Sequence, residues 1–268
     1  MERTKPADLL HTGIGRYEIF DFSGDRLGQL KTFLKTKKQP YSFHVPFFRP
    51  SYFPHSGVST FFLNESPRKR ELSFRLINST LHYAKSWEAD FIVTHLVWKD
   101  DSNNRKKVMT HVSKARSIFC KLSDKYDVPI NIEFGGYSGY FHKPIQFVDF
   151  VSDHPLLGIC IDIGHTFLIA KARNRNFLND IETMAPYTKS IHVWNTKDLD
   201  HCKKHNHVPV HPSQKISDGW IDIKKTLEII LSCNKDCDIV FEYNRTYYDK
   251  IPYKVKEGME WIKDIVKR

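Results

Sequence analysis

The sequence predicts an α/β fold, a (β/α)8 barrel of the TIM type, and three observations favour it. Short apolar, β-branched runs such as residues 158–161 alternate with longer segments of helical periodicity. The runs are apolar throughout, as is typical of parallel strands buried on both faces. Several of them end in a histidine or an acidic residue. Because TIM-type barrels carry their sites beyond the carboxyl ends of the strands, we expect these terminal residues to be functional.

The first half of the chain begins with a strand in residues 17–22, where apolar and polar residues alternate. A helix follows in residues 24–34, because Leu27, Leu30 and Leu34 fall on one helical face. Residues 41–44 form the next strand, and a long Pro- and aromatic-rich excursion follows in residues 45–64. Ser66 before Pro67 is typical of a helix start, so we expect a helix from there through residue 83.

The second half continues the same alternation. We predict strands in residues 91–95, 128–133, 158–162, 190–194 and 238–243, and helices in residues 106–122, 143–151, 177–184, 222–231 and 255–266. Residues 195–218 lack periodicity and contain four histidines, which indicates a long loop at the site. The count gives seven strands, with residues 58–63 as an eighth candidate. It leaves open whether the barrel is complete at its N-terminal strand.

Composition favours one soluble domain over residues 1–268. Hydrophobic residues make up 40% of the chain, no linker-like segment interrupts it, and no apolar run approaches the roughly 20 residues that span a bilayer. We therefore expect a cytoplasmic protein without a membrane partner. Its five cysteines form no paired CxxC clusters, so neither a disulfide framework nor a structural zinc site is indicated. The net charge of +10 indicates either anionic partners, such as phosphorylated sugars or nucleic acid, or simply a solvated cationic surface.

Four strand-end residues are the main site candidates: Glu133, Asp162, His192 and Glu242. A barrel would bring them from four strands to one point. Mixed carboxylate and imidazole ligands suit a divalent metal, namely Mn²⁺, Mg²⁺, Co²⁺, Fe²⁺ or Zn²⁺. The alternative for each residue alone is an ordinary surface or capping role.

These motifs resemble the xylose isomerase-like barrel superfamily, which includes sugar isomerases and epimerases and the endonuclease IV branch. Cys160-Ile-Asp162-Ile-Gly-His165 is similar to that family's strand-end Asp-x-x-His. Asn131-Ile-Glu133, Ile191-His192 and Phe241-Glu242 follow in the expected order, and the resemblance covers the chain from about residue 17 to the end. It implies that Glu133, Asp162, His192 and Glu242 bind one divalent metal, with Glu133 and Glu242 as the catalytic acid/base pair.

The endonuclease branch uses further ligands for three zinc ions, and His44, His95 and His165 stand where it places histidines. The branch also has an Asp-x-His element, whereas this chain has Pro209 in the acid's place if His211 matches the histidine. That departure argues against a three-zinc cluster.

Other residues are possible metal or substrate ligands. His44, His95, His165, His207 and His211 are candidates, with structural histidines as the alternative, and Lys197 would bind a substrate oxyanion or be an ordinary exposed lysine. Trp98 and Trp194 would form apolar walls for a sugar ring or belong to the core.

Three functions follow. The first is a metal-dependent sugar or sugar-phosphate isomerase/epimerase, in which two glutamates transfer protons at a metal-bound substrate. The alternatives are an endonuclease IV-like zinc phosphodiesterase acting on abasic DNA and a non-catalytic barrel that binds metal or a phosphorylated ligand. The sequence leaves the oligomeric state open.

Overall fold

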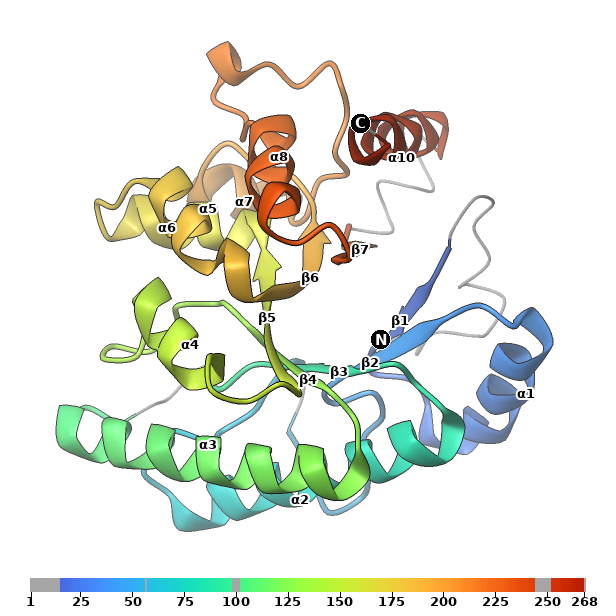
Figure 1. Cartoon of the computed structure of the whole chain (residues 1–268), viewed down its shortest axis with the longest axis vertical. Coiled ribbons are helices and arrows are strands. Elements are labelled where there is room, and N and C mark those ends of the chain that lie inside the picture. Colours follow the sequence, from blue (N-terminus) through green and yellow to red (C-terminus); the bar gives the residue numbers. More distant parts are fainter. Residues whose placement is uncertain (1–14, 56, 98–101, 244–251, 268) are drawn as a thin grey trace. The chain divides into compact units, whose positions relative to one another are not determined.

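The computed structural model describes residues 15–55, 57–97, 102–243 and 252–267 (Figure 1). The chain divides into two compact units. The first contains residues 1–133, 137–142 and 150–158, and the second contains residues 134–136, 143–149 and 159–268. Each unit is described separately below.

Among the residues that the structure describes, four parallel strands organise the first unit. They are β1 (Tyr17–Ile19), β2 (Tyr41–His44), β3 (Ile92–Thr94) and β4 (Ile130–Glu133). Each pairs with the next along the chain, as in Phe43 with Ile92 and Val93 with Asn131. All residues of β3 and β4 are buried, which explains why these strands appear in the sequence as short apolar runs. Because β2, β3 and β4 pair in parallel, the carboxyl ends of β2 and β4 carry His44 and Glu133 to the same edge of the unit.

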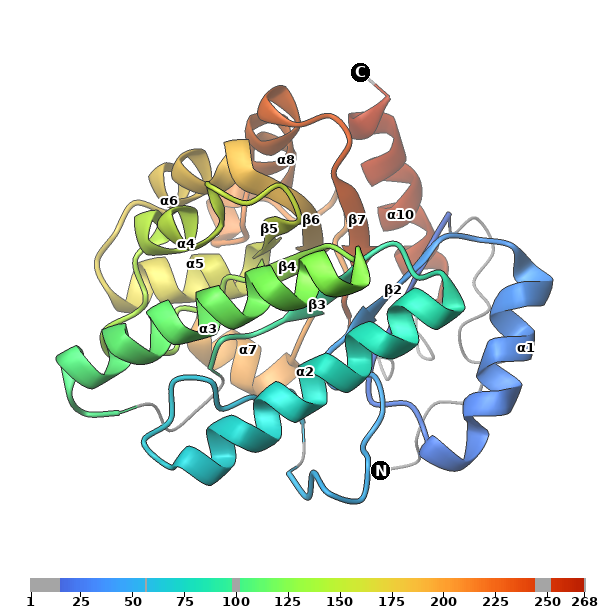
Figure 2. The same cartoon turned by 60° about the horizontal axis from the view of Figure 1, so that its bottom comes forward.

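Three helices connect these strands: α1 (Leu27–Lys37), α2 (Pro67–Trp87) and α3 (Arg105–Tyr126). Ser66 caps α2 by accepting a hydrogen bond from the Lys69 N–H, and Pro67 occupies the first turn, as the sequence predicts. Asn104 caps α3 in the same way through the Lys107 N–H. Helices α2 and α3 lie side by side along the strands (Figure 2).

The eighth-strand candidate, residues 58–63, is not a strand. Phe61 makes only an isolated antiparallel bridge to Val97. The segment is instead held by side chains, since the Thr60 hydroxyl donates to the carbonyl of His95 and the Ser73 hydroxyl accepts from the Phe61 N–H. Whether another strand precedes β1 concerns residues that lie largely outside the described part of the chain.

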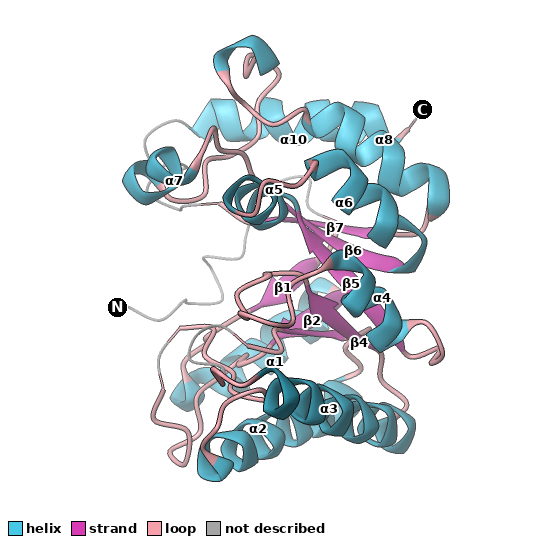
Figure 3. Cartoon of the chain, turned by 90° about the vertical axis from the view of Figure 1, so that its left-hand side faces the viewer, coloured by secondary structure: helices cyan, strands magenta, loops and turns pink. Residues whose placement is uncertain are grey.

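The second unit contains β5 from Ile159 on, β6 (Thr188–Val193) and β7 (Asp238–Phe241); β5 as a whole is Leu157–Asp162. These strands are also parallel and pair in chain order, with Asp162 opposite His192 and His192 opposite Val240. The helices are α5 (Ile163–Ala172), α6 (Phe177–Met184), α7 (Leu199–His205), α8 (Ile223–Cys233) and α10 (Pro252–Val266). Helix α4 (Pro144–Val151) begins in this unit. Figure 3 shows the strands and helices in separate colours.

Two helices of this unit were not expected from sequence. Helix α5 starts directly after the strand residue Asp162, and α7 lies inside the segment predicted to be a loop. Asp162 caps α5, and Asp198 caps α7 through the His201 N–H. Short polar residues that accept such bonds allow a helix to start without a separate turn.

Parallel pairing of successive strands, alternating with helices in both units, confirms the predicted TIM-type α/β class. Among the described residues, no helix is both long and apolar enough to cross a membrane.

Candidate metal and catalytic site

The first unit holds one carboxylate between two histidines. Oε2 of Glu133, at the end of β4, lies 2.8 Å from Nε2 of His44 and 3.1 Å from Nε2 of His95. His44 ends β2, His95 follows β3 directly, and all three side chains are buried. One ligand atom from each residue lies within 4.8 Å of the other two, close enough for a shared metal ion.

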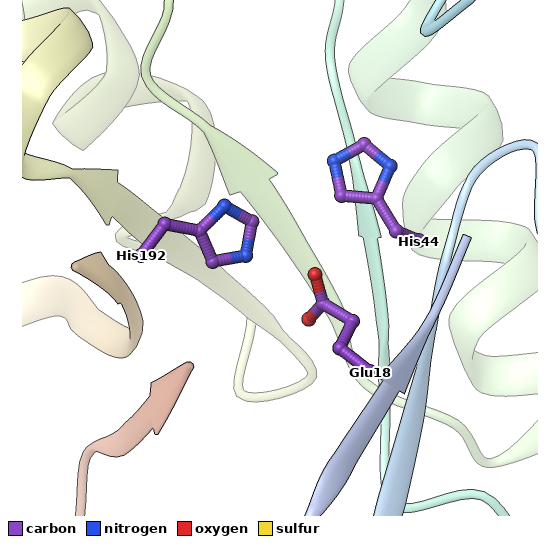
Figure 4. A group of neighbouring side chains, drawn as sticks. All are labelled: Glu18, His44 and His192. Atoms are coloured by element: carbon purple, nitrogen blue, oxygen red, sulfur yellow. The ribbon is translucent and has the colours of Figure 1, made fainter. Parts of the chain in front are cut away.

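Glu18, on β1, is an acidic residue of this unit that the sequence analysis did not select. Its Oε2 accepts a hydrogen bond of 3.1 Å from the hydroxyl of Ser42, its partner on β2. Figure 4 shows Glu18 and His44 on these neighbouring strands. Strand alternation could have found Glu18, because it stands between the buried residues Tyr17 and Ile19 and so faces the other side.

In the second unit, the buried carboxylate of Asp162 is held by two donors. Oδ1 accepts the backbone N–H of His165 at 2.6 Å, and the indole N–H of Trp194 donates to both oxygens, at 2.9 and 2.8 Å. Nε2 of His165 lies 3.9 Å from Oδ2 of Asp162. His192, opposite Asp162 on β6, is also buried.

Glu242 follows β7 and, like Glu133, lies against two histidines. Its Oε2 is 3.0 Å from Nδ1 of His192, which Figure 4 also draws, and its Oε1 is 3.3 Å from Nδ1 of His207. Burial alone raises the pKa of Glu242, but hydrogen bonds and charge from the two histidines outweigh it and hold that pKa well below its usual value. Glu242 is therefore ionised at neutral pH.

A stacked pair of rings links the carboxylates of Asp162 and Glu242. The rings of Trp194 and His207 are nearly parallel, at 9°, with centroids 4.0 Å apart. The His165 ring packs edge-on against both, with centroids 5.2 Å from each. Of the two proposed roles for Trp194, the structure supports the core position, since the residue is fully buried.

Two predicted site residues have other partners. Nε2 of His211 lies 2.7 Å from Oε2 of Glu257 on α10, and its Nδ1 lies 2.7 Å from the Ser213 hydroxyl. The ammonium of Lys197 lies over the Trp220 ring, 5.2 Å from its centroid. Trp98 falls outside the described residues. Of the two loop histidines predicted as ligands, His207 is thus the one that contacts a predicted metal ligand, Glu242.

In the first unit the donor atoms of His44, His95 and Glu133, two imidazoles and a carboxylate, lie close enough together for one divalent metal. In the second unit Asp162, His192 and Glu242 offer one imidazole and two carboxylates, with His192 opposite Asp162 and 3.0 Å from Glu242. Such sets suit Zn²⁺, Mn²⁺, Fe²⁺ or Co²⁺.

Comparison with protein families gives one match, to the xylose isomerase-like TIM barrel, over residues 8–265. The chain belongs to this family. The resemblance predicted from the sequence is confirmed, because the match extends over nearly the whole of this chain. Among curated proteins, no sequence matches it.

Solved structures with the same fold include three informative examples. A D-tagatose 3-epimerase-like protein is 18% identical, with a TM-score of 0.65, and the match covers 95% of this chain and 91% of that one. D-Psicose 3-epimerase from Clostridium cellulolyticum H10, solved with D-tagatose, is 13% identical, with a TM-score of 0.66 and coverages of 95% and 90%. The IolI protein, solved with a bound zinc atom, is 14% identical, with a TM-score of 0.68 and coverages of 95% and 88%. At these identities the similarity establishes the fold.

Proposed function

We propose that this protein is a divalent-metal-dependent sugar or sugar-phosphate isomerase/epimerase. The observation that supports it best is the environment of the two predicted acid/base residues. Glu133 and Glu242 each lie within 3.3 Å of ring nitrogens of two histidines from their own unit. Each carboxylate is therefore fixed in place and has a partner that can exchange protons with it.

The proposed metal ligands are Glu133, Asp162, His192 and Glu242, as the sequence motifs imply. TIM-type barrels in general carry functional residues at the carboxyl ends of their strands, and the proposal requires residues 1–268 to act as a single domain. When bound, a divalent metal would polarise the substrate carbonyl and so acidify the adjacent C–H bond.

The two glutamates would transfer the protons. One carboxylate removes the proton from the carbon next to the carbonyl, and the electron pair of that C–H bond forms the double bond of an enediolate. The second glutamate, in its protonated form, donates a proton to the same carbon from the opposite face, and this inverts the configuration of that carbon. The lowered pKa of Glu242 keeps its carboxylate ionised, and removal of a proton requires that form.

The proposed substrate is a ketose or ketose phosphate. Neighbouring structures of 9–18% identity include epimerases of D-psicose and L-ribulose, and this chain's excess of ten positive charges favours a phosphorylated substrate.

Solvent exchange tests this proposal. The protein is incubated with Mn²⁺ or Co²⁺ and a panel of ketoses and ketose phosphates in D₂O, and NMR detects deuterium at the carbon next to the carbonyl. We expect incorporation with the wild type and its loss in Glu133→Gln and Glu242→Gln. Glu257→Gln, a matched change on α10, should retain it. A metal-loaded wild type that exchanges no substrate of the panel would contradict the proposal.

A second candidate is the endonuclease IV-like phosphodiesterase, and one observation favours it. His44 and His95 both turn to Glu133, and His165 and His207 pack together beside Asp162 and Glu242. These histidines are the extra ligands that several zinc ions would need. The test is incubation with an abasic-site duplex and zinc. A phosphodiesterase of this kind would incise the duplex, and its activity would fall steeply as salt increases. We expect no incision. A metal-binding barrel without catalysis would show neither activity.

A further inference from the structure

We propose that Trp194 is a positioning residue that, together with His207, sets the orientation of the Asp162 and Glu242 carboxylates for metal binding. The proposal rests on the metal dependence proposed above. It assigns a role to an indole that neither the motifs nor the acid/base chemistry requires.

The first step is the hydrogen bond to Asp162. The indole N–H lies 2.9 Å from one oxygen and 2.8 Å from the other, so it points between them and opposes rotation of the carboxylate. The His165 N–H then distinguishes the two oxygens by binding Oδ1 at 2.6 Å. Because a carboxylate side chain otherwise rotates broadly about its last torsion, these two donors fix the direction of its lone pairs.

The second step is that the indole itself cannot move. Trp194 is fully buried, and one face of its ring stacks on His207. Its six-membered ring also fills the place that a side chain at Gly164 would take, since a Cβ there would lie 2.2 Å from Cε2. Packing at this density leaves a single position for the donor.

The third step extends the arrangement to Glu242. Asn195 and Val208 form a bridge, with the Asn195 N–H donating to the Val208 carbonyl at 2.8 Å. This bridge places His207 against Trp194, and Nδ1 of His207 lies 3.3 Å from Oε1 of Glu242. The stack of Trp194 on His207 therefore links the side chain that holds Asp162 to the side chain that contacts Glu242.

The test compares cobalt binding with fold stability. Trp194→Phe keeps an aromatic ring and removes the N–H, and replacement of Trp194 by benzothienylalanine removes the N–H at nearly constant shape. Trp261→Phe, a half-buried residue on α10, is the matched control. Each protein is titrated with Co²⁺ alone, the visible d–d bands are recorded, and the melting temperature is measured without metal.

We expect both Trp194 variants to bind Co²⁺ about 10- to 100-fold more weakly, with altered d–d bands, which is the range for loss of a partner that orients a metal ligand. The benzothienylalanine protein should stay folded but melt at a lower temperature, because the buried Asp162 loses a donor. Trp261→Phe should match the wild type in Co²⁺ affinity and in its d–d bands. His207→Leu should weaken binding while leaving Trp194 bonded to Asp162.

Unchanged affinity and bands in the benzothienylalanine protein would overturn the positioning role while leaving the proposed function intact. Equal weakening in Trp261→Phe would also overturn it. A wild type that binds no Co²⁺ would instead reject the proposed metal dependence, and this inference with it.

Discussion

Gly164 and Trp194 occupy the same space: a Cβ atom on Gly164 would lie 2.2 Å from the indole Cε2 and 2.3 Å from Cζ2. Gly164 lies in the first turn of α5, and its neighbour Asp162 accepts the indole N–H. A glycine in a helix is normally unfavourable, so here the close approach of the ring, rather than local propensity, requires it.

Gly164→Ala should therefore destabilise the protein, although the same change in an open helix stabilises it. We expect a loss of about 1–3 kcal/mol in the free energy of unfolding, because the buried indole must shift. Gly28→Ala is the control: Gly28 lies in α1 with no atom within 4 Å of its would-be Cβ, so a gain of about 0.5–1 kcal/mol is expected. Urea unfolding measures both, and a stabilising effect at Gly164 would contradict the packing described.

The sequence predicts the strand ends well because that signal is local. Apolar runs and the cap formed by Ser66 and Pro67 need no tertiary knowledge. The helix after Asp162 was missed because Asp162 serves both as a strand residue and as a helix cap.

Sequence cannot rank the loop histidines, since only tertiary packing distinguishes them. His207 reaches Glu242, whereas His211 reaches Glu257. The donor role of Trp194 is hidden for the same reason, because its partner Asp162 is 32 residues away in the chain.

The ion pair of Arg175 and Asp180 predicts that its effect on the free energy of unfolding depends on pH. Nε of Arg175 donates to Oδ2 of Asp180 at 2.7 Å, and Asp180 is buried. Burial raises the pKa of Asp180, and the bond and charge of Arg175 partly offset that rise. Because the folded pKa is raised, the folded state binds this proton more tightly than the unfolded state. The ionised form of Asp180 therefore destabilises the folded state, and this destabilisation decreases as pH falls through the folded pKa.

Arg175→Met removes the offset, so we expect a loss of about 2–3 kcal/mol at pH 7 and a smaller loss at an acidic pH, where Asp180 becomes protonated. Lys203→Met breaks an exposed pair with Asp200 and should change stability by less than about 0.5 kcal/mol. Denaturant unfolding at the two pH values measures this, and an equal loss at both would count against the assignment.

The cysteines should differ sharply in reactivity. Burial raises the pKa of Cys237 to about 12, and its thiol donates to the Thr188 carbonyl at 3.1 Å. Cys233 is exposed, and Cys160 is fully buried. Because the thiolate is the reactive form, Cys237 should be alkylated far more slowly than Cys233 at pH 8.

Iodoacetamide labelling followed by peptide mass spectrometry gives the order, and Cys233→Ser should remove the fastest-labelled site. Labelling of Cys237 as fast as Cys233 in the folded protein would contradict the burial of its thiol.

The metal content of three purified proteins tests the central claim most directly. Wild type, Glu133→Ala and Asp162→Ala are compared by elemental analysis after equilibration with a divalent metal and removal of the excess. We predict about one ion per chain in the wild type and loss of that ion in both variants, because each removes a carboxylate from the proposed ligand set. Three zinc ions per chain would favour the phosphodiesterase, and equal metal in all three proteins would contradict the proposed site.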